Sequence, residues 1–337
     1  MIAIDPNTPR LALIGCGAIA ESFYLPALAR HQNVMDQLIL VDRDLARLDL
    51  LGNQHGIDRR ETDYQRILGE VDGAIVATPP ALHHQISMAF LQSGSHILCD
   101  KPLAEDGQQV HEMKTQAEEA GTHILVNNTR RLFPSSRRIK ELIDTGTIGK
   151  LRSIEYHEGG PFSWPTVSGF YFDTKKNSKG ITQDRGAHVF DLVCWWLGTK
   201  PTILDYKDDS YGGPEAVAEL TFSTSECQGV VKMSLLNKLS NRYVIKGESG
   251  SITGDVYDRL QFMITTHTGQ SRTVKVPSKV RYFNDLAFEL VDNFIQIIRG
   301  QATPLISATD VIPSIQLIDE CYANRTRFDL PWITDRR

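Results

Sequence analysis

The first third of the chain carries short, continuous apolar runs, each followed by a stretch with the spacing of an amphipathic helix. A strand buried on both faces appears as an uninterrupted apolar run, whereas a strand with one exposed face alternates. The repeated order of strand and helix predicts a parallel, doubly wound α/β sheet. The strand-like runs are Leu11–Ile14, Leu38–Val41, Val71–Ala77, Ile97–Cys99 and His123–Val126, and the helices predicted between them include Leu45–Leu51, Ala81–Gln92 and Glu105–Ala120.

Beyond Asn127 the pattern changes. After a predicted helix and a predicted strand, the chain between Ile203 and Val276 alternates apolar and polar residues, which predicts an antiparallel sheet with one covered face. Two longer helices close the chain. The helices are predicted over Ser135–Thr145, Asn284–Arg299 and Ala308–Asn324, and the strands over Leu151–His157, Ala216–Phe222, Gly229–Leu235, Tyr243–Ile245 and Leu260–Ile264.

The first apolar run ends in Gly15-Cys16-Gly17-Ala18-Ile19-Ala20, a G-x-G-x-x-A pattern at a predicted helix start. This pattern is typical of dinucleotide binding: Gly15 permits a tight turn, Gly17 lets the backbone approach a pyrophosphate, and Ala20 allows close packing of helix on strand. The helix N-terminus directs N–H groups at the phosphates. A glycine-rich turn without a ligand would have the same sequence. The strand–turn–helix context favours the dinucleotide, with contacts at Gly15, Gly17, Ala18 and Ile19.

Length and pattern together predict two domains. The chain has 337 residues, enough for about two domains. We expect an NAD(P)-binding Rossmann domain over residues 1–127. An α+β domain with a large, mostly antiparallel open sheet is expected over residues 128–337, for substrate binding and oligomerisation. We leave open that its C-terminal helices pack back on the first domain.

Asp42 ends the second strand. A carboxylate there accepts hydrogen bonds from the adenosine ribose and repels a 2′-phosphate, so it favours NAD over NADP. Arg43 follows directly and could stack on adenine or tolerate that phosphate, which keeps NADP open. Alternatively, Asp42 is a turn or N-cap residue before the next helix.

Asp100-Lys101-Pro102 follows the strand Ile97–Cys99. In open α/β sheets ligands bind at the carboxyl edge, so Lys101 would deliver a cation to the cofactor. Pro102 ends the strand ladder and restricts the backbone after the lysine. A solvated lysine at a strand end is the alternative interpretation.

Asp184 and His188 lie four residues apart in a predicted helix that starts near Asp184, and Asp191 follows three residues later. This spacing places the three side chains on one helix face. Taken singly, Asp184 could be an N-cap and His188 a core histidine. A metal site of Asp/His/Asp type is a third possibility, but no further ligands are evident, so we predict no metal.

Residues 159–180 form a long segment rich in glycine, proline and aromatic residues, including Trp164. A loop of this length without secondary structure is usually a binding loop or lid. We therefore expect Trp164 to contact a substrate.

Composition excludes several classes of protein. The net charge is −5, so no basic excess suggests nucleic acid. The apolar runs are far below the roughly 18 residues of a membrane span, and the N-terminus lacks the pattern of a signal peptide. Scattered cysteines without a CxxC motif favour reduced thiols in the cytoplasm over disulfides or zinc. They are Cys16, Cys99, Cys194, Cys227 and Cys321.

Taken together, and nearly end to end, these motifs resemble the glucose-fructose oxidoreductase / inositol dehydrogenase / MocA (Gfo/Idh/MocA) family. The residues that carry the resemblance are Gly15–Ala20, Ala77-Thr78-Pro79-Pro80-Ala81-Leu82-His83, Asp100-Lys101-Pro102, Arg130-Arg131 before Pro134, Ile148-Gly149, Asp184-x-Gly186-x-His188-x-x-Asp191 and Gly247-Glu248-Ser249-Gly250.

The resemblance implies an NAD(P)-dependent oxidoreductase that transfers hydride between nicotinamide and a secondary alcohol or ketone of a sugar, nucleotide sugar or cyclitol. It implies that Lys101, Asp184 and His188 are catalytic, and that Arg130 joins Trp164, Asp184 and His188 around the substrate. Further cofactor contacts are implied at Asp42, Arg43, Thr78, Pro79, His83, Asp100 and Lys101. A homo-oligomer, a dimer or tetramer through the C-terminal sheet, is also expected, because a half-exposed sheet often marks an interface.

Some residues depart from the family pattern. Asp100 stands where a glutamate is usual, and Ser178-Lys179-Gly180 where a glycine triplet is common. Thr182 and Gln183 replace apolar residues, and Asn127-Asn128-Thr129 is atypical. These departures leave the substrate open. The alternatives are a ketoreductase acting on a nucleotide-linked keto-sugar and a catalytically silent NAD(P)-binding regulator on the same fold.

Overall fold

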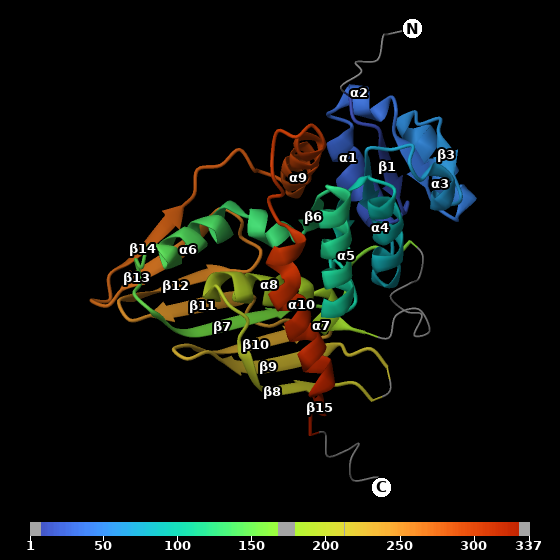
Figure 1. Cartoon of the computed structure of the whole chain (residues 1–337). Helices are drawn as coiled ribbons and strands as arrows, with labels where there is room; N and C mark the ends of the chain where they lie inside the picture. Colours follow the sequence, from blue (N-terminus) through green and yellow to red (C-terminus); the bar gives the residue numbers. More distant parts are fainter. Residues whose placement is uncertain (1–7, 168–178, 212, 330–337) are drawn as a thin grey trace. The chain divides into compact units, whose positions relative to one another are not determined.

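The computed structural model describes residues 8–167, 179–211 and 213–329. The chain divides into two compact units (Figure 1). Their described parts are residues 8–129, 165–167 and 279–312 for the first unit, and 130–164, 179–211, 213–278 and 313–329 for the second. The domain boundary after residue 127 stays a prediction.

The first unit is built on a parallel sheet of six strands in the order β3-β2-β1-β4-β5-β6. This is the strand order of the dinucleotide-binding fold, with the reversal of strand order between β1 and β4. The predicted Rossmann fold is therefore confirmed. The strands are β1 (Leu11–Ile14), β2 (Ile39–Val41), β3 (Arg60–Glu61), β4 (Gly73–Val76), β5 (His96–Asp100) and β6 (Ile124–Asn127).

Local signals set the bounds of the helices in this unit. Asp44 and Asp106 cap α3 and α5 by accepting backbone N–H groups, and Gly56 and Gly121 end the same helices in the left-handed conformation. The helices are η1 (Ala20–Tyr24, π-helical), α1 (Leu25–Leu28), α2 (Gln32–Met35), α3 (Leu45–His55), η2 (Tyr64–Ile67), η3 (Pro80–Leu82), α4 (His83–Gln92), α5 (Gly107–Ala120) and α9 (Phe283–Ile298).

The second unit is built on a nine-stranded mixed sheet in the order β14-β13-β12-β11-β7-β10-β9-β8-β15. Most neighbours are antiparallel, as predicted, but β7 runs parallel to β10, and β15 runs parallel to β8. The strands are β7 (Leu151–Gly159), β8 (Thr202–Asp208), β9 (Val217–Ser223), β10 (Gln228–Ser234), β11 (Arg242–Gly247), β12 (Gly250–Asp255), β13 (Gln261–Thr266), β14 (Ser271–Lys275) and β15 (Thr326–Arg327).

One face of this sheet carries the core of the second unit. Buried and half-buried residues alternate strictly along β9, which is the pattern of a sheet covered on one face. Residues of α8, and Leu317 and Ile318 of α10, join the sheet in that core, and Figure 1 shows the helices in front of the strands. The helices are η4 (Thr129–Leu132), α6 (Pro134–Asp144), α7 (Ile181–Asp184), α8 (Gly186–Leu197) and α10 (Ala308–Ala323). Thr129 and the first residues of α10, up to Ile312, belong to the first unit.

The helix expected to start near Asp184 begins earlier, at Ile181, so Asp184 is not an N-cap. The predicted lid over residues 159–180 falls partly on residues 168–178, which lie outside the described residues, and it stays a prediction.

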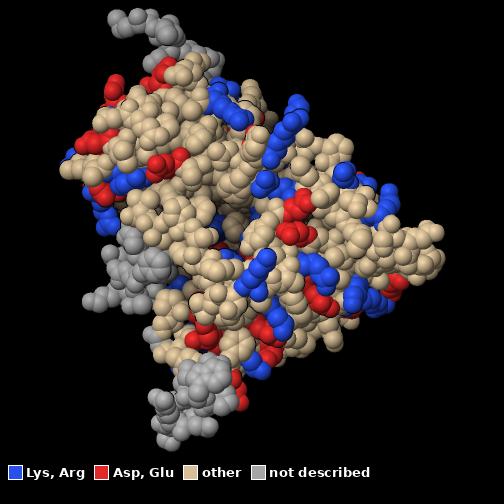
Figure 2. Space-filling view, turned by 180° about the vertical axis from the view of Figure 1, so that it is seen from behind, with Lys and Arg blue, Asp and Glu red and all other residues tan. Residues whose placement is uncertain are grey.

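The described surface mixes the two signs of charge. Figure 2 shows basic and acidic side chains interspersed on the face that it presents, in keeping with 36 Lys and Arg against 41 Asp and Glu. Within the described ranges, no helix combines the length and the apolar character needed to cross a membrane.

Candidate active site

The turn after β1 is held by three strands. Gly15 has φ of +99°, a conformation that favours glycine. Its N–H donates to the Val41 carbonyl at 2.8 Å. A Cβ at Gly15 would lie 2.6 Å from the Ala77 carbonyl oxygen, so only glycine lets β1 turn this close to β4.

Gly17 differs from Gly15, although both belong to the same motif. A Cβ added at Gly17 would meet nothing within 4 Å, and the residue is half-buried. The open space lies in front of backbone at the start of a helix, which is where a pyrophosphate approaches in this fold. The turn therefore fits a dinucleotide.

Asp42 lies against this turn. Its Oδ2 accepts the Cys16 N–H at 2.7 Å, and its Oδ1 accepts the Asp44 N–H at 2.9 Å. The N-cap of α3 is Asp44, whose carboxylate accepts from Ala46 and Arg47, so the alternative of Asp42 as N-cap is wrong. The carboxylate stands at the end of β2 beside the glycine turn, the position of a ribose-binding acid, and Arg43 is exposed.

His83 joins two loops of the same sheet edge. Its ring is fully buried, with Nδ1 2.7 Å from the Pro102 carbonyl oxygen and Nε2 2.7 Å from the Thr78 carbonyl oxygen. Burial lowers the pKa of His83, although both carbonyls oppose this shift. The ring ties the Thr78-Pro79 loop to the segment after Lys101. A role of His83 toward the cofactor would be indirect, and its assignment as a contact stays a prediction.

Asp100, at the end of β5, is the centre of a polar network that the sequence did not reveal. Its Oδ1 accepts from Asn127 Nδ2 at 2.7 Å and from the Tyr24 hydroxyl at 3.1 Å. Asn127 Nδ2 also lies 2.9 Å from the Tyr24 oxygen, and Thr129 Oγ1 donates to Asn127 Oδ1 at 2.9 Å. These contacts fix the residue that precedes Lys101. The atypical Asn127 and Thr129 thus have a structural role.

Burial shapes the ionisation of this network. It raises the pKa of Asp100 above its ordinary value, while Lys101 and His83 act in the opposite direction. Burial and the neighbouring Asp100 raise the pKa of Tyr24, so this phenol stays protonated and donates. Tyr24 lies in the π-helical segment η1, a type of irregularity frequent at functional sites.

In the second unit, Asp184 and His188 lie on one nearly continuous helix. Asp184 ends α7, Gly186 starts α8, and Arg185 between them keeps helical angles of −79° and −36°. The four-residue spacing therefore places both side chains on the same face, and both residues are half-buried.

Asp191, the third member of the predicted face, is part of an internal ion pair. Its carboxylate is 1% exposed and accepts two hydrogen bonds of 2.7 Å from Arg131 Nε and Nη2. This pairing is the bidentate geometry that arginine and carboxylate favour. Asp191 therefore anchors α8 to Arg131, and a role for it beside Asp184 and His188 stays a prediction.

Arg130 is also engaged within the second unit. Its Nη1 and Nη2 lie 2.5 Å and 2.7 Å from the two carboxylate oxygens of Glu158, and Nη1 also donates to the Tyr156 hydroxyl at 2.8 Å. Burial alone would raise the pKa of Glu158, but the charge and hydrogen bonds of Arg130, with smaller contributions from Arg185 and Tyr257, hold the pKa below its usual value. A substrate contact of Arg130 stays a prediction and would compete with this ion pair.

The remaining predicted groups lie apart along the chain. Trp164 is 42% exposed. Lys101 belongs to the first unit, whereas Asp184 and His188 belong to the second, so their convergence on one reacting group stays a prediction. Within the described ranges, no cluster of three or more histidine, cysteine or acidic residues could hold a metal ion.

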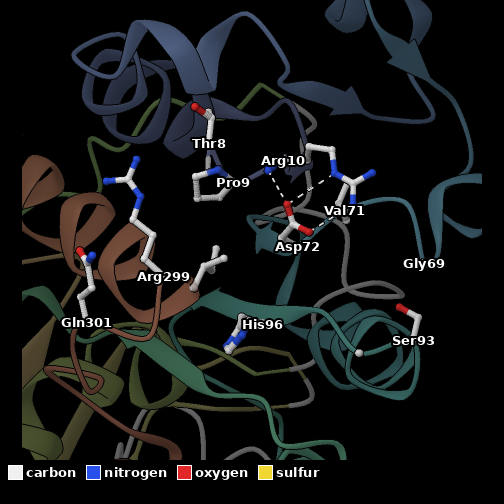
Figure 3. Close-up of a pocket in the computed structure, with 12 residues that line it drawn as sticks. Thr8, Pro9, Arg10, Gly69, Val71, Asp72, Ser93, His96, Arg299 and Gln301 are labelled. Carbon is white, nitrogen blue, oxygen red and sulfur yellow. Dashed lines mark hydrogen bonds and ion pairs between the residues drawn. The ribbon is translucent and has the colours of Figure 1, made fainter. Parts of the chain in front are cut away.

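The first unit has a hollow of about 850 Å³ (Figure 3). It is lined by residues before β1, before β4 and at the start of β5, such as Arg10, Asp72 and His96, together with Arg299 after α9. Asp72 accepts the Arg10 N–H at 2.7 Å there. These residues mark the amino edge of the sheet, opposite to Gly15, Asp42 and Asp100. The hollow is therefore not the cofactor site.

Comparison with known proteins agrees with this geometry. Residues 9–128 match the model of the oxidoreductase family with an NAD-binding Rossmann fold, and residues 136–253 match the GFO/IDH/MocA C-terminal domain. The chain belongs to the Gfo/Idh/MocA oxidoreductase family. The predicted membership in this family is therefore confirmed. The predictions of an NAD(P)-dependent oxidoreductase and of NAD as the cofactor are confirmed as well.

Similar members of the Gfo/Idh/MocA family have several activities. Inositol 2-dehydrogenase of Rhizobium meliloti is 22% identical over 93% of this chain and 95% of its own length. Levoglucosan dehydrogenase, in complex with NADH and levoglucosan, superposes with a TM-score of 0.80 at 18% identity, covering 93% of this chain and 96% of that one. A 3-ketoreductase from Actinomadura kijaniata, with NADP and TDP-benzene, has a TM-score of 0.81 at 19% identity and coverages of 96% and 100%. At these identities the two structures show the shared fold.

The two glycines of the turn yield the first prediction. We expect Gly17→Ala to leave the melting temperature unchanged, because its Cβ has free space, and to weaken NADH binding at least about tenfold by blocking the pyrophosphate. Gly15→Ala should instead lower the melting temperature, because alanine is strained at this positive φ and its Cβ would clash with the Ala77 carbonyl oxygen. Thermal unfolding and NADH fluorescence titration check both. Wild-type NADH affinity in Gly17→Ala would contradict the assignment.

The buried Arg130–Glu158 pair yields a pH-dependent prediction. At about pH 7, Glu158→Gln should lower the free energy of unfolding by about 3 kcal/mol, because it leaves Arg130 buried without its counter-charge. The folded-state pKa of Glu158 is lowered, so its stabilisation is complete above the usual value of 4.5 and is lost as pH falls below it. The difference in free energy of unfolding between the variant and the wild type should therefore narrow as the pH falls below 4.5.

Urea unfolding of Glu158→Gln and of the wild type at a series of pH values measures this difference in free energy of unfolding. Glu226→Gln is the matched control, since Glu226 pairs with Lys150 on the exposed surface and should change stability little. If the difference for Glu158→Gln stayed constant down to the lowest pH at which the protein is folded, the buried ion pair would not be its cause.

Proposed function

We propose that this protein transfers hydride between a nicotinamide cofactor and a secondary alcohol or ketone of a sugar, nucleotide sugar or cyclitol. The observation that carries the proposal is the placement of Lys101 directly after Asp100 at the carboxyl edge of the dinucleotide-binding sheet. The relatives supply the substrate class, because their names include an inositol dehydrogenase and a levoglucosan dehydrogenase.

In the proposed reaction, NAD supplies the hydride acceptor, and the side chains orient the substrate and move its proton. His188 acts as the general base that takes the hydroxyl proton, since imidazole has an ordinary pKa of about 6.5 and suits this task near neutral pH. Asp184, on the same helix face, orients His188 or holds a neighbouring hydroxyl. Lys101 hydrogen-bonds the reacting oxygen and stabilises its developing negative charge.

The same groups would serve the reverse reaction. Reduction of a keto-sugar needs a proton donor and a cation beside the carbonyl oxygen, which His188 and Lys101 provide. The similarity to a 3-ketoreductase supports this second candidate. The Asp42 carboxylate beside the glycine turn favours NAD over NADP in either direction.

We also propose that the protein is a homo-oligomer. Support comes from the nine-stranded sheet, whose strands alternate buried with half-buried or exposed residues and therefore present a second face beyond the core. Apolar side chains such as Met263, 40% exposed, lie on that face.

The direct test of the proposed function is a substrate panel. We expect NADH absorbance to appear when the protein is incubated with NAD and polyols, sugars and UDP-sugars, or to disappear with NADH and the corresponding ketones. Tight NADH binding without turnover in either direction across the panel would support the catalytically silent regulator instead.

Two substitutions test the roles of the side chains. His188→Asn and Lys101→Ala should each lower kcat at least about a hundredfold, because they remove the base and the oxyanion-stabilising cation. NAD affinity should change little. His267→Asn and Lys150→Ala, at exposed positions far along the chain, are matched controls and should retain full kcat. Near-normal turnover in either site variant would refute its assigned role.

A further inference from the structure

The helix that carries Asp184 and His188 begins on a buried glutamate from a distant part of the chain. Glu215, which precedes β9, is 1% exposed. Its carboxylate accepts the Gly180 N–H at 3.2 Å and the Thr182 N–H at 3.0 Å, and its backbone carbonyl accepts the Ile181 N–H at 2.9 Å. Three successive N–H groups at the start of α7 therefore bind one residue, which replaces the local cap that this helix lacks.

Two side chains of the C-terminal segment hold Glu215 in place. The Tyr322 hydroxyl donates to Oε1 at 2.7 Å, and Arg325 Nη2 lies 2.9 Å from Oε2. Arg325 Nε also pairs with the buried Asp208 at 2.6 Å, and its guanidinium stacks over the Tyr322 ring. The buried carboxylate is thus fully paired, which a buried charge requires.

The start of α7 fits tightly against Glu215. A Cβ at Gly180 would lie 1.9 Å from the Glu215 carbonyl oxygen, so only glycine permits this approach. The Thr182 side chain, also fully buried, hydrogen-bonds the Tyr206 hydroxyl at 2.7 Å. The position of the first turn is therefore fixed from both its backbone and its side chains.

That first turn leads directly to the catalytic pair. The Asp184 N–H donates to the Gly180 carbonyl at 3.0 Å, and the Arg185 N–H donates to the Ile181 carbonyl at 2.8 Å. The His188 backbone N–H in turn donates to the Arg185 backbone carbonyl at 2.9 Å. If residues 180–182 moved, these hydrogen bonds would move Asp184 and His188 with them. A shift of about 1 Å at a reacting group can lower the reaction rate about a hundredfold.

We propose that Glu215, held by Tyr322 and Arg325, is a positioning residue for the Asp184/His188 pair. The inference rests on the proposed function, since it concerns the geometry of that pair. Tyr322, in the last turn of α10, and Arg325, just after it, would then help to position a helix more than a hundred residues earlier in the chain.

The experiment compares Glu215→Ala with Ser135→Ala in the full-length protein. Ser135 is a buried residue of the same unit, and its hydroxyl donates to the Asp258 carbonyl, away from α7. We expect Glu215→Ala to lower kcat at least about tenfold with unchanged NADH affinity, and Glu215→Gln to lower it less, because one oxygen acceptor remains. Ser135→Ala should retain kcat although it also lowers the melting temperature.

Amide hydrogen exchange of residues 180–188 provides a readout that does not depend on turnover. Exchange there should accelerate in Glu215→Ala and not in Ser135→Ala. Normal kcat in folded Glu215→Ala, or an equal loss of kcat in Ser135→Ala, would overturn the positioning role. If Glu215→Ala does not fold, Tyr322→Phe decides, since it removes only one hydrogen bond to Glu215; unchanged kcat and exchange in that variant would overturn the proposal.

The outcomes separate this inference from the proposed function. An inactive His188→Asn with an active Glu215→Ala would refute the inference alone. A wild-type protein without turnover on the whole panel would refute the proposed function, while accelerated exchange in Glu215→Ala would still show that Glu215 fixes the helix.

Discussion

Parallel pairing fixes one register across the first sheet, and the candidate cofactor site depends on it. Ile14 pairs with both Val41 and Val76, Val76 pairs with Cys99, and Cys99 pairs with Val126. The next residue in each strand therefore stands at the same level of the carboxyl edge. These residues are Asp42, Gly15, Ala77, Asp100 and Asn127. Hydrogen bonds between the strands thus set the relative positions of Asp42, the turn at Gly15, and Asp100, the residue before Lys101.

Buried hydrogen-bond networks hold particular side chains in each of the two units. Asp100 is held by Tyr24 and Asn127, and in the second unit Glu215 is held by Tyr322 and Arg325. A buried polar network is costly when any member lacks a partner, so a satisfied one favours a single arrangement. In both units a network of this kind lies beside a proposed catalytic residue, Lys101 in one and Asp184 in the other.

The sequence predicted the parts of this arrangement that local patterns encode. Continuous apolar runs marked the buried parallel strands, and the G-x-G-x-x-A motif marked the turn at Gly15 and Gly17. The parallel neighbours β7 and β10 could not be predicted, because an alternating strand has the same pattern in either direction. The helix start at Ile181 was missed for a related reason: its cap, Glu215, lies more than thirty residues away. Tyr24 and Asn127 meet Asp100 only through the fold. The sequence held a signal for Asn127 alone, in the atypical residues after Val126.

We propose that Lys101 and His188 act on one substrate oxygen beside the nicotinamide. The most direct measurement is a crystal structure of the protein with NAD and a polyol or sugar that it turns over. We expect Lys101 Nζ and the His188 imidazole both to lie within about 3.2 Å of the same hydroxyl oxygen. A bound substrate whose reacting oxygen contacts only one of these groups, or neither, would contradict it.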